Sequence, residues 1–254
     1  MTRAPRTLIG GLAVALMLGH AAALANTACQ PAPYTEGSAE ILALAQRLTE
    51  TLAPYPSLAE ALAKGAPTLC IDDSLVEEQA YYEPKTNRIV VRTGLDPDLA
   101  LAILIHEVRH LEQYGSGNCP TTAHTLTDYM RSRLALEADA SAIGIYVAWQ
   151  MRENGNPGPW DQLQSWPTHG DLVTRFADEI AAGADEVAAT SATFAQWFES
   201  LKRREIYAYA ICGNYLDALD REKMPPGKLT LPADFAGRLC RMPDGRSYDC
   251  VLPP

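Results

Sequence analysis

The residues from His106 to His110 read H-E-x-x-H, and their types and spacing specify a chemistry more directly than any other part of the chain. Two histidines four positions apart share one face of a helix, so both imidazoles can reach one metal ion. Glu107 between them can hold and deprotonate a water that the metal binds. The pattern predicts metal-assisted hydrolysis of an amide, with His106 and His110 as ligands and Glu107 as the base.

The flanking sequence places this motif in the middle of a helix. Asp96 can cap a helix that begins at Pro97, whose ring already fixes φ for the first turn. The helix is expected to continue to Tyr114 and to stop at the Gly-Ser-Gly of residues 115–117. Both histidines extend an apolar stripe of this helix, and we therefore expect them to face the interior.

A third protein ligand is needed, because a catalytic zinc site holds three protein ligands and leaves its fourth position to water. The helical extension H-E-x-x-H-x-x-G-x-x-H is absent, since Gln113 and Ser116 occupy its Gly and His places. Glu137 is favoured, because it lies among small residues in a predicted helix over residues 126–153. Glu137 would lie roughly 17 Å into that helix, so the preceding loop must carry the chain back that far. Otherwise Asp128 would be the third ligand.

The motif followed by Glu137 resembles the gluzincin branch of the zincin metallopeptidases. The strings at residues 106–113 and 137–142 are also similar to bacterial metallopeptidase domains of unknown function. This resemblance implies a Zn²⁺ site made by His106, His110 and Glu137. It also implies an edge strand above the active helix, expected at Arg88–Arg92, on which an extended peptide substrate could pair.

One position departs from the gluzincin pattern. Many gluzincins carry an Asp four residues after the ligand glutamate, where it holds a ligand histidine, and Ser141 occupies that place here. Candidate donors to an oxyanion are one histidine and three tyrosines, although a structural role is the favoured interpretation of each, because buried tyrosine hydroxyls normally find local partners. They are His169, Tyr207, Tyr209 and Tyr215.

Hydrophobic periodicity and turn residues predict an α+β fold that is predominantly helical. A small antiparallel β-hairpin, Gln79–Glu83 with Arg88–Arg92, is expected to pack on the motif helix, and the C-terminal part is expected to be helical. Because no linker composition appears, residues 26–254 are predicted to form a single zincin-like metallopeptidase domain. Further predictions are a strand at residues 68–71, helices at residues 38–52, 57–64, 170–182 and 193–220, and a surface tail from Met224.

The first 25 residues have the features of a secretory signal peptide. Arg3 and Arg6 precede an apolar stretch at residues 8–18, and the Ala-Leu-Ala of residues 23–25 is a cleavage signal. The apolar stretch is too short for a membrane span, so we expect a secreted or periplasmic protein with no stable span after cleavage. A lipoprotein signal at Cys29 is the weaker interpretation, since Asn26 occupies the place of a leucine-like residue.

The cysteines indicate the cellular compartment, and the net charge limits the kinds of partner that the protein can bind. Six cysteines follow the signal, and an even number in an exported chain predicts disulfides. Cys240 and Cys250 are the pair that sequence favours, because the intervening Pro-Asp-Gly of residues 243–245 is turn-forming. The formal net charge of −10 argues against nucleic acid as a partner and leaves a peptide or protein substrate.

Three hypotheses for function follow from these residues. The leading one is an exported zinc-dependent peptidase. The alternative is a non-catalytic, zinc-stabilised binding or envelope-assembly module that retains the zincin fold, and the third is a metal-free helical protein joined by disulfides. Glu107 favours the enzyme, because a module that needs only the metal has no use for a carboxylate between the two ligands.

Overall fold

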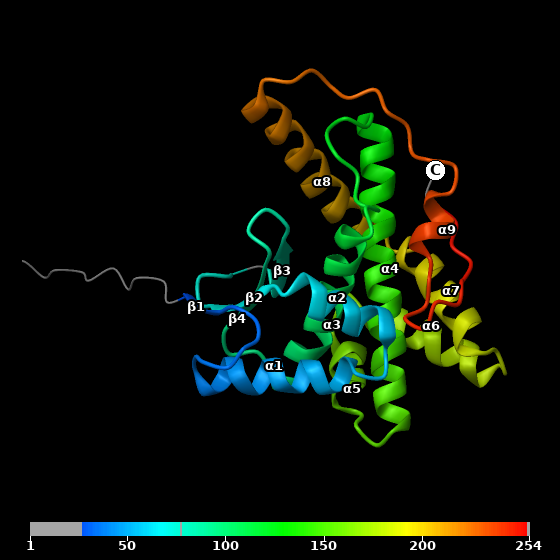
Figure 1. The fold of residues 1–254 in the computed structure, drawn as a ribbon. Helices are drawn as coiled ribbons and strands as arrows, with labels where there is room; N and C mark the ends of the chain where they lie inside the picture. Colours follow the sequence, from blue (N-terminus) through cyan, green and yellow to red (C-terminus); the bar gives the residue numbers. More distant parts are fainter. Residues whose placement is uncertain (1–26, 77, 253–254) are drawn as a thin grey trace, which may run out of the picture.

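The computed structural model describes residues 27–76 and 78–252, so the predicted signal peptide over residues 1–25 lies outside the described residues. The fold is α+β and predominantly helical, as predicted (Figure 1). The strands are β1 (Thr27–Gln30), β2 (Thr68–Asp72), β3 (Ala80–Glu83) and β4 (Arg88–Arg92). The helices are α1 (Ala39–Leu52), α2 (Pro56–Gly65), α3 (Pro97–Gly115), α4 (Leu126–Glu153), α5 (Gly158–Ser165), α6 (Gly170–Ala181), α7 (Glu186–Trp197), α8 (Leu201–Glu222) and α9 (Phe235–Leu239).

The four strands form one mixed sheet in the order β1-β2-β4-β3. The predicted hairpin is present, since β3 and β4 pair antiparallel, but β2 and β4 are parallel. The expected edge strand at Arg88–Arg92 was wrong, because β4 lies between β2 and β3. Three successive buried residues in both β2 and β4 are typical of interior strands, whereas β3 is half-buried along its length and forms the edge.

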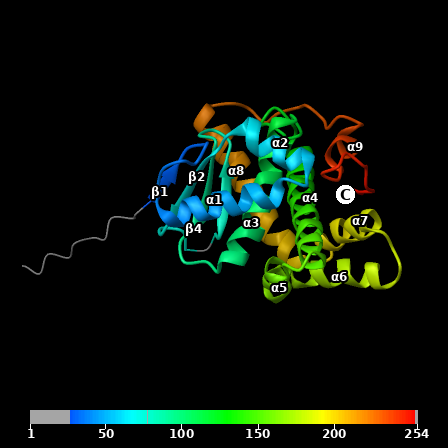
Figure 2. The same ribbon diagram turned by 60° about the horizontal axis from the view of Figure 1, so that its bottom comes forward.

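The paired helices α3 and α4 form the centre of the molecule. Asp96 caps α3 by accepting hydrogen bonds from two backbone N–H groups, and Thr125 caps α4 in the same way. Helix α3 packs against α1, α2, α4, α5 and the strands β3 and β4. Figures 1 and 2 show the sheet and α8 on one side of the pair and α6, α7 and α9 on the other. Consequently α3 is buried around most of its circumference, more widely than the single predicted stripe.

The loop between α3 and α4 carries the chain well past the end of α3 before α4 begins (Figure 1). Its end is anchored to the C-terminal segment, because Thr125 N–H donates to Leu229 O and Leu229 N–H donates to Ala123 O, each at 2.9 Å. The middle of α4 therefore crosses the end of α3, where Gln113 Nε2 donates to Leu136 O at 3.0 Å. This offset brings Glu137 alongside the motif.

The C-terminal helices differ from the prediction of one helix over residues 193–220. The chain forms α7 and α8 with a break at residues 198–200, because the hydroxyl of Ser200 accepts from Arg203 N–H and caps a new helix. Helix α5 was not predicted, since eight residues are too few to show a helical period.

The tail after Met224 is not confined to the surface. It contributes buried apolar side chains to the same hydrophobic core that contains the buried face of α1. Among them are Phe235, Leu239 and Tyr248. The predicted disulfide between Cys240 and Cys250 is present within this tail.

A second disulfide joins Cys29 of β1 to Cys70 of β2. Cys119 and Cys212 are free thiols, so two disulfides join four of the six cysteines. Within residues 27–76 and 78–252, no helix is both long and apolar enough to cross a bilayer.

Candidate metal centre

Two imidazoles and one carboxylate meet where α3 and α4 cross. The ligand atoms of His106, His110 and Glu137 all lie within 4.8 Å of one another. Oε2 of Glu137 lies 3.5 Å from Nε2 of His106 and 3.4 Å from Nε2 of His110. Ligand atoms of a tetrahedral zinc ion with bonds of about 2.1 Å are about 3.4 Å apart. The spacing of these donors therefore fits a zinc-sized ion.

The local sequence of each helix explains why these side chains come together. On α3, the four-residue spacing stacks His106 and His110 one turn apart, with ring centroids separated by 4.7 Å. On α4, the small residues Ala135, Ala138 and Ala142 are fully buried and let the backbone approach its neighbours closely. The alternative ligand Asp128 lies outside the cluster, because its Oδ2 accepts from the backbone N–H of Leu231.

Gln113 determines which nitrogen of His110 faces Glu137. Its Nε2 donates to Leu136 O and to Asp139 Oδ2, at 3.0 and 2.6 Å, so its Oε1 is the acceptor toward His110 Nδ1 at 2.8 Å. His110 Nδ1 therefore carries the proton, and Nε2 keeps its lone pair for a metal. The sequence placed Gln113 on the motif stripe, but it did not identify this role.

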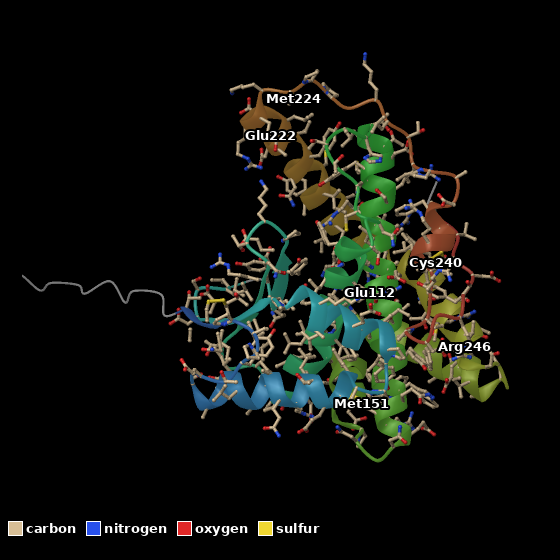
Figure 3. The ribbon with its side chains drawn as sticks, viewed as in Figure 1. Glu112, Met151, Glu222, Met224, Cys240 and Arg246 are labelled. Atoms are coloured by element: carbon tan, nitrogen blue, oxygen red, sulfur yellow. A yellow bond between two sulfur atoms is a disulfide. The ribbon has the colours of Figure 1, made fainter. Side chains whose placement is uncertain are left out.

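Asp139 is fully buried and holds the side chain of Gln113 in place by accepting its hydrogen bond. Arg109 donates to both of its oxygens, from Nε at 2.7 Å and Nη2 at 2.9 Å, and Tyr248 donates its hydroxyl to Oδ1 at 2.6 Å. Arg109 also binds Glu112 and two backbone carbonyls of the tail. Figure 3 labels Glu112 and Cys240 at this junction of α3 with the tail. Asp139, two residues after Glu137, thus provides a supporting carboxylate where Ser141 does not.

Glu107 lies between α3 and the edge strand. It is 6% exposed, and burial raises the pKa of its carboxyl group, an effect that the charges of His106 and His110 partly offset. Its carboxylate also accepts a hydrogen bond from the backbone N–H of Tyr82 in β3. The net rise in pKa makes this carboxylate a better proton acceptor than an exposed glutamate.

His110 and Glu137 form an ion pair in the absence of a cation. Burial lowers the pKa of His110, but Glu137 and Glu107 outweigh it and raise the pKa to about 9. Burial also opposes ionisation of Glu137, yet His110 and His106 hold its pKa well below the usual range. A metal cation would take the place of the proton on His110.

Two of the four candidate oxyanion donors lie near the cluster. Burial, followed by the charges of Glu137 and Glu107, raises the pKa of Tyr207. Burial, followed by the charges of His106 and Arg203, lowers the pKa of His169 to about 3, so its imidazole is neutral. The other two lie away from the site, since Tyr209 is 85% exposed and Tyr215 donates to His124 O at 2.9 Å.

Comparison with known proteins supplies a family. The sequence profile described as "Putative metallopeptidase family (DUF6782)" matches residues 20–250. No curated protein and no solved structure matches the chain. The family description implies a metal ion, and the His-His-Glu cluster is the group that could hold one among the residues that the structure describes. Because the profile spans nearly the whole chain, the protein belongs to the family of that description.

Proposed function

We propose that the protein is an exported, zinc-dependent peptidase of gluzincin-like type that hydrolyses peptide bonds. The observation that carries this proposal is the arrangement of His106, His110 and Glu137 at tetrahedral spacing, with the buried carboxylate of Glu107 beside them. Imidazole nitrogen and carboxylate oxygen are ligands that zinc prefers, and three protein ligands leave one position open.

The roles of the residues follow from their placement. His106 and His110, as neutral imidazoles, and Glu137 would hold Zn²⁺ through Nε2 and Oε2. When bound, the ion would polarise the substrate carbonyl and lower the pKa of a water toward about 7. Glu107 accepts the proton of the attacking water and passes it to the leaving nitrogen. The hydrogen bond from Tyr82 N–H fixes one end of this carboxylate.

The edge strand β3 offers a place for an extended peptide. Tyr82 N–H turns toward Glu107, and therefore Tyr82 belongs to the alternate residues whose backbone groups face away from β4. Ala80, two residues earlier, faces the same way, while Gln79 O accepts from Arg92 N–H on the inner side. The outward backbone groups of Ala80 and the C=O of Tyr82 can bind a peptide as an added strand beside the cluster, while Tyr82 N–H holds Glu107.

Tyr207 and His169 are the proposed oxyanion donors. The hydroxyl of Tyr207 keeps its proton because burial and two nearby carboxylates raise its pKa. Neutral His169 has Nδ1 hydrogen-bonded to Thr168 Oγ1 at 3.0 Å and its ring stacked on Trp166. Both groups are held by packing, and both can donate to a developing negative charge without reorganisation.

Export is supported by the two disulfides and by the leader sequence. Disulfides such as Cys29–Cys70 and Cys240–Cys250 persist in oxidising compartments and are rare in a reducing cytosol. Together with the predicted signal at residues 1–25, they favour a secreted or periplasmic site of action.

Metal analysis of the purified protein is the first test. We expect one zinc per chain in the parent and in Asp128→Ala, and loss of zinc in His110→Ala and Glu137→Ala. Full zinc retention by the Glu137 variant would remove this residue from the ligand set.

Digestion of a peptide library is the second test. The parent should cleave peptides, Glu107→Gln should not, and Glu153→Gln at the exposed end of α4 serves as the matched control. Equal cleavage by parent and Glu107→Gln would contradict the assigned base. Stoichiometric zinc with no cleavage by the parent would instead favour a zinc-stabilised binding or envelope-assembly module.

A further inference from the structure

Arg133 is half-buried and differs from the buried arginines of the molecule in how few acceptors it meets. Arg109 and Arg203 each bind a carboxylate together with backbone carbonyls, so their donors are used within the fold. Arg133 donates from Nη1 to Tyr114 Oη at 2.9 Å, and no carboxylate of the described chain lies within 4.0 Å of it. Its Nε and Nη2 are left for a group that is not part of these residues.

The location of Arg133 connects it to the metal centre. It precedes Glu137 by one turn of α4, and Tyr114 follows His110 by one turn of α3. Residues four apart share a helix face, so both side chains extend the face that carries the proposed ligands. Burial lowers the pKa of Arg133, but Tyr114 and Glu137 outweigh it and keep the guanidinium charged.

The groups around Arg133 are aromatic rings and a thiol, and none of the described carboxylates forms an ion pair with it. The ring of Tyr114 packs edge-on against Tyr82 of the edge strand, with centroids 5.6 Å apart. The thiol of Cys119 also lies here, and burial raises its pKa to about 12, so it remains neutral. The carboxylate that acts electrostatically on Arg133 is that of Glu137, whose Oε2 lies against the two imidazoles.

We propose that Arg133, oriented by Tyr114, is a carboxylate-binding subsite for the substrate. A guanidinium presents parallel N–H groups that match the two oxygens of a carboxylate. The preferred peptide would therefore carry a carboxylate close to the bond that is cleaved, either its C-terminal α-carboxylate or an Asp or Glu side chain. This inference rests on the proposed peptidase function, and it names a substrate class for the same site.

Binding measurements without turnover test this subsite. The zinc-loaded full protein with Glu107→Gln is titrated calorimetrically with N-acetyl-tetra-alanine as the free acid and as the amide. Amide-capped versions with Glu or Gln at each position complete the set. A charge-assisted pair should make at least one acidic peptide bind roughly ten-fold tighter than its neutral counterpart. A preference for the free acid identifies the C-terminal carboxylate, and a preference for Glu identifies a side chain.

Matched variants then assign the preference to Arg133. Adding Arg133→Gln should make the acidic and neutral peptides bind equally, whereas Arg131→Gln removes the same charge from the same helix and should keep the preference. Zinc content and thermal melting verify that each variant is folded. If Arg133→Gln does not fold, Tyr114→Phe removes the orienting hydroxyl and should reduce the preference.

The outcomes separate this inference from the proposed function. Equal binding of acidic and neutral peptides by the protein with intact Arg133, or a preference that survives Arg133→Gln, would overturn the subsite. Failure of the peptidase proposal has a different signature, in which the parent cleaves no peptide while the Arg133-dependent preference persists.

Discussion

The polar groups on the two sides of the His-His-Glu cluster are satisfied to different degrees. On the side of the tail, Gln113, Asp139, Arg109 and Tyr248 bind one another, and the described donors and acceptors are matched. On the side of the edge strand, Arg133 has one partner.

This difference separates groups that position the site from groups that are available to a ligand. A buried network whose members are all paired fixes the geometry of its side chains. Removing one member destabilises the fold, because its partner is left buried and unpaired. A half-buried cation with free donors and a half-buried strand edge have unused binding capacity. The tail side should therefore respond to mutation in stability and metal affinity, and the strand side in catalysis and substrate choice.

The largest expected effect is on the strand side. Glu107→Gln keeps the size of the side chain and removes the proton acceptor, so kcat should fall by roughly 10²–10⁴-fold. Zinc content and thermal stability should stay near those of the parent, which metal analysis and thermal unfolding check. A comparable loss of zinc would mean that Glu107 supports the cluster and would weaken the distinction between the two sides.

The second effect is a loss of stability on the tail side. Asp139→Asn removes the fully buried carboxylate that pairs with Arg109 and leaves the partly exposed Glu112 as its charged partner, which should cost about 3 kcal/mol of unfolding free energy, the low end for breaking a buried pair. Urea unfolding measures it. Asp171→Asn is the control, because Asp171 pairs with buried Arg203 but its own side chain is 39% exposed. Similar costs for both variants would show that burial of the carboxylate is not what matters.

The third effect concerns the link between the sides. Gln113→Leu removes the acceptor that fixes the tautomer of His110, and loss of such a supporting contact lowers metal affinity by roughly 10–100-fold. Competition with a zinc chelator measures this shift. Gln150→Leu, on the far half of α4, is the matched control. Unchanged affinity in the Gln113 variant would leave Asp139 and its network with a purely structural role.

The sequence was sufficient for features that depend on neighbouring residues. The caps Asp96 and Thr125 and the four-residue histidine spacing are local signals, and they predicted α3, α4 and the shared face of the histidines. Glu137 was chosen because a third ligand is needed, and its place near the motif depends on the loop that precedes α4. The break at Ser200 was missed, because one capping serine is a weaker signal than an apolar periodicity that continues across it.

The supporting network could not be predicted in the same way. Asp139 meets Arg109 across 30 positions and Tyr248 across 109. These contacts exist because the tail folds against α3 and α4, and no local pattern encodes such a tertiary arrangement. The interior position of β4 likewise depends on its parallel pairing with β2, which is decided by burial of both strands.

The smallest expected effect is a pH dependence that comes from His169. Its pKa of about 3 in the fold lies below the value of about 6.5 for an unfolded chain. The unfolded state therefore binds more protons between these values, so stability is fully present above pH 6.5 and falls as pH decreases toward 3. Between pH 7 and pH 5.5, His169 should account for about 1.2 kcal/mol of lost stability. His169→Gln should lose less over this interval in urea unfolding at each pH, with His124→Gln as the control for a partly exposed imidazole outside the cluster. The same loss in parent and His169→Gln would show that this imidazole is not held neutral beside the cluster, and would remove it as an oxyanion donor.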